Sequence, residues 1–486
     1  MLETKNPDMS RAAMAPLHQV PRIHLEKAGL WKLLVFLTIF LNITEGAMRK
    51  WLFPGSSQLL YFAKDAVLIA AYGLFFLQGH YAVDKRLKQL TIWYMLSAVV
   101  VCLDAFNPNL GSVVVGLFGI KCYLLYVGLA YLATQLFNDQ TSLERFARWQ
   151  VFAAIPICLL GIAQFGTPAD SPLNRYAIGD EQMVATFGMD ATVRITGTFA
   201  FISGHAFFVF VSIALAVGLL GTSSRRSSYL LSIVALVLCV GNIWMTGSRA
   251  IGLMAVTLVA VVLGWFGFQP NRVGLRLRVL LVIAIALAAF TTTTWFNKAY
   301  NAYLDRIESS DDEFMDRAFQ HHDVMGQLLD YSGFIGFGTG ITHPGSTALQ
   351  QALQLTPSQP VPTFEAEYAR VLVEVGWIGA FLWYAFRIAV LLAIWNVYRS
   401  LRMIELRCWA FIIFLVHLLT LNSAVVLNHT FAIYYWLFAG LALGLPRLES
   451  HYSENYDVPV RENVWSKQSV TLAPAQNPSL MGKIAN

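Results

Sequence analysis

The sequence is poor in charged residues, which make up only 13% of its 486 positions, whereas 56% are hydrophobic. Soluble domains are about 25% charged, so a chain of several soluble domains is excluded. The five cysteines lie in or beside apolar runs without C-x-x-C spacing, which argues against a disulfide or metal framework. The net charge of +5 needs no nucleic-acid partner, because the bias of Lys and Arg toward cytoplasmic loops accounts for it.

Three further features are missing. No internal repeat is evident, which weighs against transporter folds built from inverted halves. The glycines Gly336, Gly338 and Gly340 lack the spacing and the strand–helix setting of a dinucleotide site. No cleavable signal peptide is expected, because the first apolar run begins near Leu30 behind a polar leader.

Long apolar runs fill most of the chain. A membrane-spanning helix needs about 20 apolar residues, and a count on that basis predicts about twelve spans. The expected fold is all-α, a polytopic transmembrane helical bundle with a large helical outer loop between spans nine and ten. The predicted spans cover residues 30–47, 59–79, 89–106, 111–133, 147–165, 197–220, 228–246, 248–267, 276–295, 369–395, 408–425 and 430–446.

Basic residues recur in every second loop between these spans. Because such loops stay in the cytoplasm, both termini are expected there, on either side of a transmembrane domain of residues 30–447. Residues 1–29 form a polar leader, and residues 448–486 form a tail whose mixed polar composition predicts disorder. Two long loops, residues 166–196 and 296–368, then lie on the outer face.

The second of these loops is too long for a simple connection, which indicates a function. Apolar residues recur at helical spacing between Phe314 and Leu329, and they predict an amphipathic helix on the membrane surface or over the bundle. A glycine-rich segment, SGFIGFGTG at residues 332–340, ends this helix.

Four arginines stand at the outer ends of spans or in this loop, against the usual charge bias: Arg194, Arg249, Arg317 and Arg370. A guanidinium binds phosphate oxygens in a bidentate fork and keeps its proton. Together they predict a binding site for a phosphate or pyrophosphate on the outer face. The alternative for each arginine is pairing with a nearby carboxylate or with lipid headgroups.

Three residues are candidates for a general base. Glu365 and Glu367 precede the tenth span, and His343 follows the glycine-rich segment. Glu367 also stands at helical spacing from Arg370 and Glu374, so an internal ion-pair ladder is the alternative. No pair of histidines in the loop has a strong metal-ligand pattern, and no metal is expected.

Single polar residues inside the spans have a simpler interpretation. Lys64 and Asp65 are expected to neutralise each other or their neighbours. The other polar residues of this kind are expected to form hydrogen bonds between helices: Lys121, His205, Asn242 and His417.

Several motifs in this order resemble the O-antigen ligase and O-antigen polymerase superfamily. They are RITGTF at 194–199, TGSRA at 246–250, the loop helix with its GFGTG end, and EVGWIGAFL at 374–382. The resemblance covers about residues 190–395. It implies transfer of a glycan from undecaprenyl pyrophosphate to an acceptor hydroxyl on the outer face, with neither nucleotide sugar nor metal.

The resemblance also assigns residues. Arg249 matches the family arginine of the SR motif, and Arg317 resembles the arginine that opens the loop helix. Family ligases carry a histidine followed by Asn, Ser or Gln, and nine residues separate this pair from a GxxG motif, which Gly376 and Gly379 match here. Glu365 occupies the histidine position and Ala366 the next one, so the sequence departs from the ligase pattern.

The leading hypothesis is a polymerase that joins undecaprenyl-pyrophosphate-linked glycan units for exopolysaccharide, capsule or O-antigen. The expected partners are that glycan, membrane lipid and other polysaccharide assembly proteins, with no cofactor. The expected location is the bacterial inner membrane. The alternatives are a ligase that moves glycan onto lipid A core or another acceptor, and a transporter of polysaccharide or lipid carrier.

Overall fold

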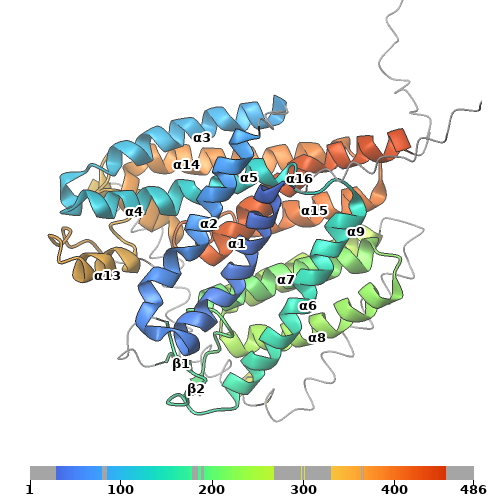
Figure 1. The fold of residues 1–486 in the computed structure, drawn as a ribbon, viewed down its shortest axis with the longest axis horizontal. Helices are drawn as coiled ribbons and strands as arrows, with labels where there is room; N and C mark the ends of the chain where they lie inside the picture. Colours follow the sequence, from blue (N-terminus) through green and yellow to red (C-terminus); the bar gives the residue numbers. More distant parts are fainter. Residues whose placement is uncertain are drawn as a thin grey trace, which may run out of the picture.

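The computed structural model describes residues 29–78, 85–177, 184–187, 191–267, 297, 300–301, 330–362, 364 and 366–455. Within these residues the protein is a bundle of long helices with one two-stranded ribbon (Figure 1). Ten helices are long and apolar enough to cross a membrane, which confirms an all-α, multi-pass membrane protein. The expected ninth span, residues 276–295, and the loop helix of Phe314 to Leu329 lie outside the described residues.

The helices are α1 (Leu30–Ala47), α2 (Ser57–Leu77), α3 (Lys85–Asp104), α4 (Val113–Leu124), α5 (Leu129–Ala133), α6 (Gln140–Phe165), α7 (Ile202–Thr222), α8 (Arg226–Thr246), α9 (Arg249–Gly267), α13 (Pro344–Ala352), α14 (Glu367–Ser400), α15 (Ile404–Leu419) and α16 (His429–Asn455). The strands β1 (Thr186–Phe187) and β2 (Thr192–Val193) pair antiparallel.

Helix α7 forms the centre of the bundle. Its residues from His205 to Gly221 are all buried, and it packs against α6, α8, α9, α15 and α16. A helix that is apolar all round must be covered on every side by other helices. The lipid-facing helices, by contrast, expose large apolar side chains, as α3 does with Ile92, Met95 and Leu103.

Three elements differ from the prediction. Helix α15 ends at Leu419, six residues before the predicted end of its span, because the chain turns there toward α16. Helix α16 runs to Asn455, so the start of the tail at 448 was wrong and eight of its residues are helical. The short helix α13, which begins at a proline, was not predicted.

Helix α14 contains a break that a single predicted span did not include. At Gly376 the backbone has φ 62° and ψ −178°, so two helices meet there at a sharp angle. In an unbroken helix the amides of Trp377 and Ile378 would donate to the carbonyls of residues 373 and 374. Here they donate to Gly333 and Phe334 at 3.2 and 3.4 Å.

The two carbonyls released by the break are also bonded. Phe337 N donates to Val373 O at 2.8 Å, and Gly338 N donates to Glu374 O at 2.9 Å. The glycine-rich segment thus replaces both lost helical hydrogen bonds. Close approach requires glycine on each side, because a Cβ on Gly336 would lie 2.5 Å from the amide nitrogen of Gly376.

We expect Gly376→Ala to destabilise the protein strongly. The backbone conformation at this position costs a non-glycine residue about 1–3 kcal/mol, and the new Cβ would lie 2.4 Å from the carbonyl of Phe334. The melting temperature of the purified protein in detergent measures the effect. Gly264→Ala in α9 is the control, since its Cβ would meet nothing within 4 Å. An unchanged melting temperature for Gly376→Ala would contradict the break.

Candidate functional site

A polar cavity of about 300 Å³ lies at the end of the bundle where α7, α9 and α14 begin. On the predicted topology this end faces outward. Its lining combines a cation, an anion and hydroxyl or amide groups. The polar residues that line it are Arg194, Ser203, Ser248, Glu367, Asn422 and Ser423. Such a mixture suits a ligand that carries both negative charge and hydroxyl groups.

The segment after β2 carries Arg194 to this cavity. The amide of Arg194 donates to Ala185 O at 2.9 Å, which continues the ribbon, and its Nε donates to Thr246 O at 2.9 Å at the end of α8. Two residues beyond, Ser248 and Ala250 line the cavity on either side of Arg249. The RITGTF and TGSRA motifs are therefore brought together, as a shared anion site requires.

Two residues that sequence analysis did not single out hold the RITGTF segment in place. Gln164 Oε1 accepts from the amides of Thr196 and Gly197 at 3.1 and 2.7 Å. Lys50 Nζ donates to Thr196 Oγ1 at 2.7 Å and to Gly197 O at 3.0 Å. Lys50 comes from a π-helical turn, Met48–Leu52, that continues α1 and turns this side chain inward. Both residues position the segment that carries Arg194.

Glu367 is buried at the cavity wall and is held by several donors. Its Oε1 accepts from the amides of Val425 and Val426 at 2.8 and 3.0 Å and pairs with Arg387 Nη1 at 3.5 Å. Its Oε2 has one longer contact, 3.3 Å from the amide of Val426. Arg387 is twenty residues further along α14, and the break at Gly376 allows the two ends to approach.

Arg370 and Glu374 act on one residue of the large loop. Arg370 Nη1 donates to Thr342 O at 2.9 Å, while Glu374 Oε1 accepts from Thr342 N at 3.1 Å and from Thr342 Oγ1 at 2.7 Å. This clamp fixes the residue before His343. Glu367, Arg370 and Glu374 stand at the predicted helical spacing, but Glu367 forms its ion pair with Arg387. Arg370 is not among the residues that line the polar cavity.

His343 lies in a different place from Glu367. It caps α13 by accepting from the amide of Gly345 at 2.9 Å through Nδ1, and its ring packs edge-on against Phe118. Burial, with a smaller contribution from Lys121, lowers the pKa of His343 to about 3, so the imidazole is neutral. Its role as a base stays a prediction. Glu365 and Arg317 lie outside the described residues.

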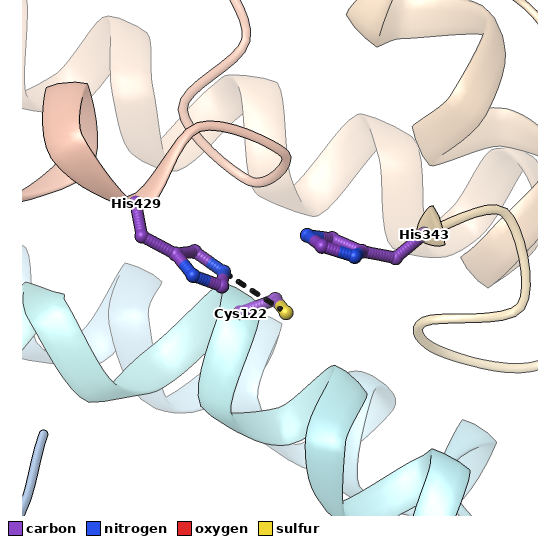
Figure 2. Close-up of side chains that lie close together, drawn as sticks. All are labelled: Cys122, His343 and His429. Atoms are coloured by element: carbon purple, nitrogen blue, oxygen red, sulfur yellow. Dashed lines mark hydrogen bonds between the residues drawn. The ribbon is translucent and has the colours of Figure 1, made fainter. Parts of the chain in front are cut away.

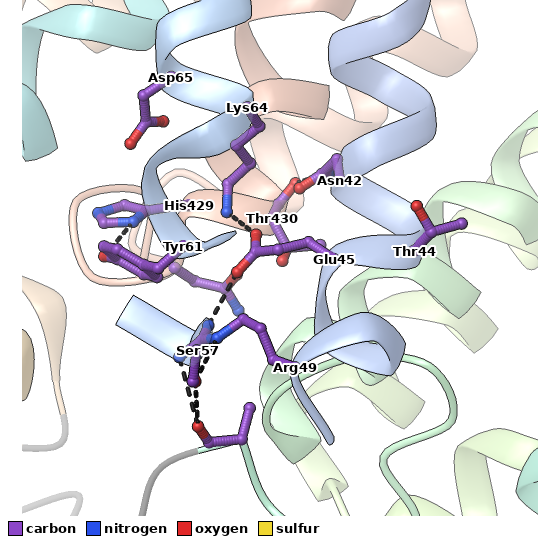
Figure 3. A network of polar contacts seen from close by, with 12 residues as sticks. Asn42, Thr44, Glu45, Arg49, Ser57, Tyr61, Lys64, Asp65, His429 and Thr430 are labelled. Carbon is purple, nitrogen blue, oxygen red and sulfur yellow. Dashed lines mark hydrogen bonds and ion pairs between the residues drawn. The ribbon is translucent and has the colours of Figure 1, made fainter. Parts of the chain in front are cut away.

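A network of buried charges joins α1 and α2 beside His429 (Figure 3), and Lys121 of α4 extends it through Asp65. Glu45 accepts from Arg49 at 2.8 Å and pairs with Lys64, while Lys121 pairs with Asp65 at 2.8 Å. The expectation that Lys64 and Asp65 neutralise each other or their neighbours is confirmed, with neighbours as the partners. The predicted bonds between helices are also confirmed, since His205 Nε2 lies 3.1 Å from Asn242 Oδ1, and His417 Nε2 lies 3.1 Å from Tyr435 O.

Tyr61 stands at the centre of the network. Its ring has the cations of Arg49, Lys64 and Lys121 at 5.2, 5.2 and 4.1 Å from its centroid. Its hydroxyl is hydrogen-bonded to Nδ1 of His429 at 2.7 Å. Sequence analysis missed Tyr61 and His429, because nothing in their spacing connects two residues that are 368 positions apart.

An apolar groove of about 640 Å³ runs along α14 beside α3. Figure 1 shows these two helices side by side. The lining is aromatic and aliphatic: Trp93, Tyr368, Leu372, Trp377, Ala380, Phe381, Tyr384, Ala385, Ile388, Ala389 and Leu392. Neighbouring residues at the start of α14 line both spaces: Ala366 and Glu367 line the cavity, and Tyr368 lines the groove.

We expect Glu367→Gln to lower the melting temperature more than the double variant Glu367→Gln/Arg387→Met. The single change leaves a buried guanidinium without its counter-charge, which costs about 3–5 kcal/mol, whereas removal of both charges is often nearly neutral. A double-mutant cycle on the purified protein measures the coupling. If the two single changes simply add, the buried pair does not stabilise the fold.

Part of the chain matches a known protein family. Residues 234–384, less than half of the chain, match the family model described as O-antigen ligase. No curated protein matches the sequence. The matched segment contains Arg249, both glycine-rich motifs and Glu367, and it ends inside α14. The resemblance stated from the motifs is confirmed over this segment.

Proposed function

Since residues 234–384 match the family model described as O-antigen ligase, we propose that this multi-pass membrane protein is a polymerase for lipid-linked glycans. Its donor is a glycan on undecaprenyl pyrophosphate, and its acceptor is a hydroxyl of a second such glycan. The reaction takes place on the outer face of the bacterial inner membrane, with both termini in the cytoplasm.

The observation that carries the proposal is that consecutive residues of α14, Glu367 and Tyr368, line the polar cavity and the apolar groove. A polyprenyl pyrophosphate glycan has a long apolar tail and a charged, hydroxyl-rich head. The groove along α14 offers the tail an aromatic and aliphatic surface, and the cavity offers the head Arg194, Glu367 and hydroxyl groups. The residues that line the two environments follow one another directly in the chain, with Ala366 and Glu367 at the cavity and Tyr368 at the groove.

The arginines are assigned to the pyrophosphate. Arg194 reaches the cavity from the segment after β2, and Arg249 begins α9 between two residues that line it. A guanidinium stabilises the negative charge that develops on the leaving pyrophosphate as the glycosidic bond breaks. Arg317 is assigned the same role by its match to the family pattern. Arg370 has a positioning role, because it holds Thr342.

The base is assigned to Glu367. Its carboxylate is held by the backbone of the loop after α15, at Val425, Val426 and Leu427. The contact of Oε2 with the Val426 amide is long, at 3.3 Å, and this atom is assigned to take the proton of an acceptor hydroxyl. Glu365, two residues earlier, is the second candidate. His343 is the third, although it is not among the residues that line the cavity.

One observation favours a ligase instead, namely that the matched family is described as O-antigen ligase. A ligase would transfer finished glycan to lipid A core or another acceptor. Against it stands Glu365 at the position where ligases of the family carry histidine. The two activities leave different intermediates on the lipid carrier, so one measurement separates them.

We expect Arg194→Ala and Arg249→Ala each to reduce glycan transfer about 10- to 100-fold. A hydrogen bond to a charged group contributes roughly 1.5–3 kcal/mol, which corresponds to that loss. The measurement is the size-resolved profile of lipid-linked glycans in cells that carry each variant in place of the wild type. Arg225→Ala is the matched control, because Arg225 is exposed at the opposite end of α8.

The profile has three informative outcomes once the variants are found in the membrane at wild-type amounts. Single repeat units accumulate if the protein is a polymerase. Long chains accumulate on the carrier if it is a ligase, which would overturn the polymerase assignment. An unchanged profile for both arginine variants would contradict glycan transfer at this cavity.

A further inference from the structure

Three side chains that commonly bind metals converge beside the buried charge network (Figure 2). Cys122 comes from α4, His343 from the turn before α13, and His429 from the start of α16. One ligand atom of each lies within 4.8 Å of the other two, and His429 Nε2 is already 3.3 Å from the Cys122 sulfur. Figure 2 shows the two imidazoles and the sulfur pointing toward a common space.

We propose that this cluster binds one copper(I) ion through Cys122 Sγ and the Nε2 atoms of His343 and His429. Thiolate binds copper(I) and zinc, and imidazole suits both ions, so the charge around the site decides between them. Metal bonds to such ligands are about 2.0–2.3 Å long, as zinc sites show, so the ligand atoms around one ion stand roughly 3.5 Å apart. The cluster reaches this geometry by a contraction of about 1 Å.

Metal binding through Nε2 also depends on what the second ring nitrogen, Nδ1, contacts in each histidine. Nδ1 of His429 is hydrogen-bonded to the Tyr61 hydroxyl at 2.7 Å and lies 3.5 Å from the Lys121 ammonium, which can only donate. Ligation through Nε2 places the proton of this ring on Nδ1, where the Tyr61 oxygen accepts it and the contact with Lys121 is lost. Nδ1 of His343 accepts from the amide of Gly345, so its proton stands on Nε2, where the Leu427 backbone is its hydrogen-bond partner. Ligation moves that proton to Nδ1 and costs both the capping bond and the contact with Leu427.

The surrounding charges favour a monovalent ion. Lys121 Nζ lies 3.5 Å from His429 Nδ1, and its charge is balanced by Asp65 at 2.8 Å. Binding breaks the Cys122 S–H bond, forms a Cu–S bond and releases one proton to solvent, and copper stays in its +1 state. Thiolate and copper(I) together are neutral. A divalent ion would leave a net positive charge in a buried site next to an ammonium group.

This site lies outside the polar cavity, because none of its three ligands lines it. Its consequence is mechanical. The metal would join the turn that Arg370 and Glu374 hold at Thr342 to α4 and α16, and so fix one end of the large loop against the bundle.

The test is an anaerobic titration of the full-length protein in detergent with copper(I), in competition with a chromophoric copper(I) chelator. We expect one ion per chain for the wild type. We expect Cys122→Ser, His343→Gln and His429→Gln each to bind at least roughly a hundredfold more weakly, since even outer-shell losses cost up to this factor. Cys102→Ser is the matched control, because Cys102 lies outside the cluster.

Two further measurements keep the result interpretable. The metal-free Cys122→Ser variant should melt at the wild-type temperature, so that lost binding is not lost folding, and X-ray absorption should show one sulfur and two nitrogen ligands. Equal loss in Cys102→Ser and Cys122→Ser, or a spectrum with sulfur ligands alone, would overturn the site. Tighter competition by zinc(II) than by copper(I) would overturn the assignment of the ion.

Discussion

The arrangement of the candidate site depends on the hydrogen bonds that cross the break in α14. Inside a membrane bundle an unpaired amide or carbonyl is costly. A helix can therefore break only where another segment supplies the lost hydrogen-bond partners. The glycine-rich segment does so with two donors and two acceptors, opposite Val373, Glu374, Trp377 and Ile378. Because the break turns the first part of α14 back, Glu367 meets Arg387 and the polar cavity acquires its carboxylate.

Two motifs far apart in sequence thus have one physical explanation. SGFIGFGTG and EVGWIG contact each other backbone to backbone, and their glycines are needed for that approach at Gly336 and Gly376. They set the angle at which a charged helix end enters the membrane.

The apolar periodicity predicted most of the helices, because a bilayer imposes both their length and their composition. It did not predict the break, since Gly376 interrupts neither the hydropathy nor the spacing of the run. The motifs RITGTF and TGSRA correctly pointed to one location, where Arg194 lies beside Ser248. The sequence could not reveal Lys50, Tyr61 or the partner of Glu367, because those contacts depend on how distant helices pack.

The boundary between Glu367 and Tyr368 has a consequence for how products would leave. A molecule held across it belongs to two phases, since its tail is confined to the plane of the bilayer and its head is in water. In the proposed reaction the spent carrier would leave within the plane of the bilayer along α3 and α14, whereas the growing chain would extend into the aqueous space. The two products would then leave along different paths and would not obstruct each other.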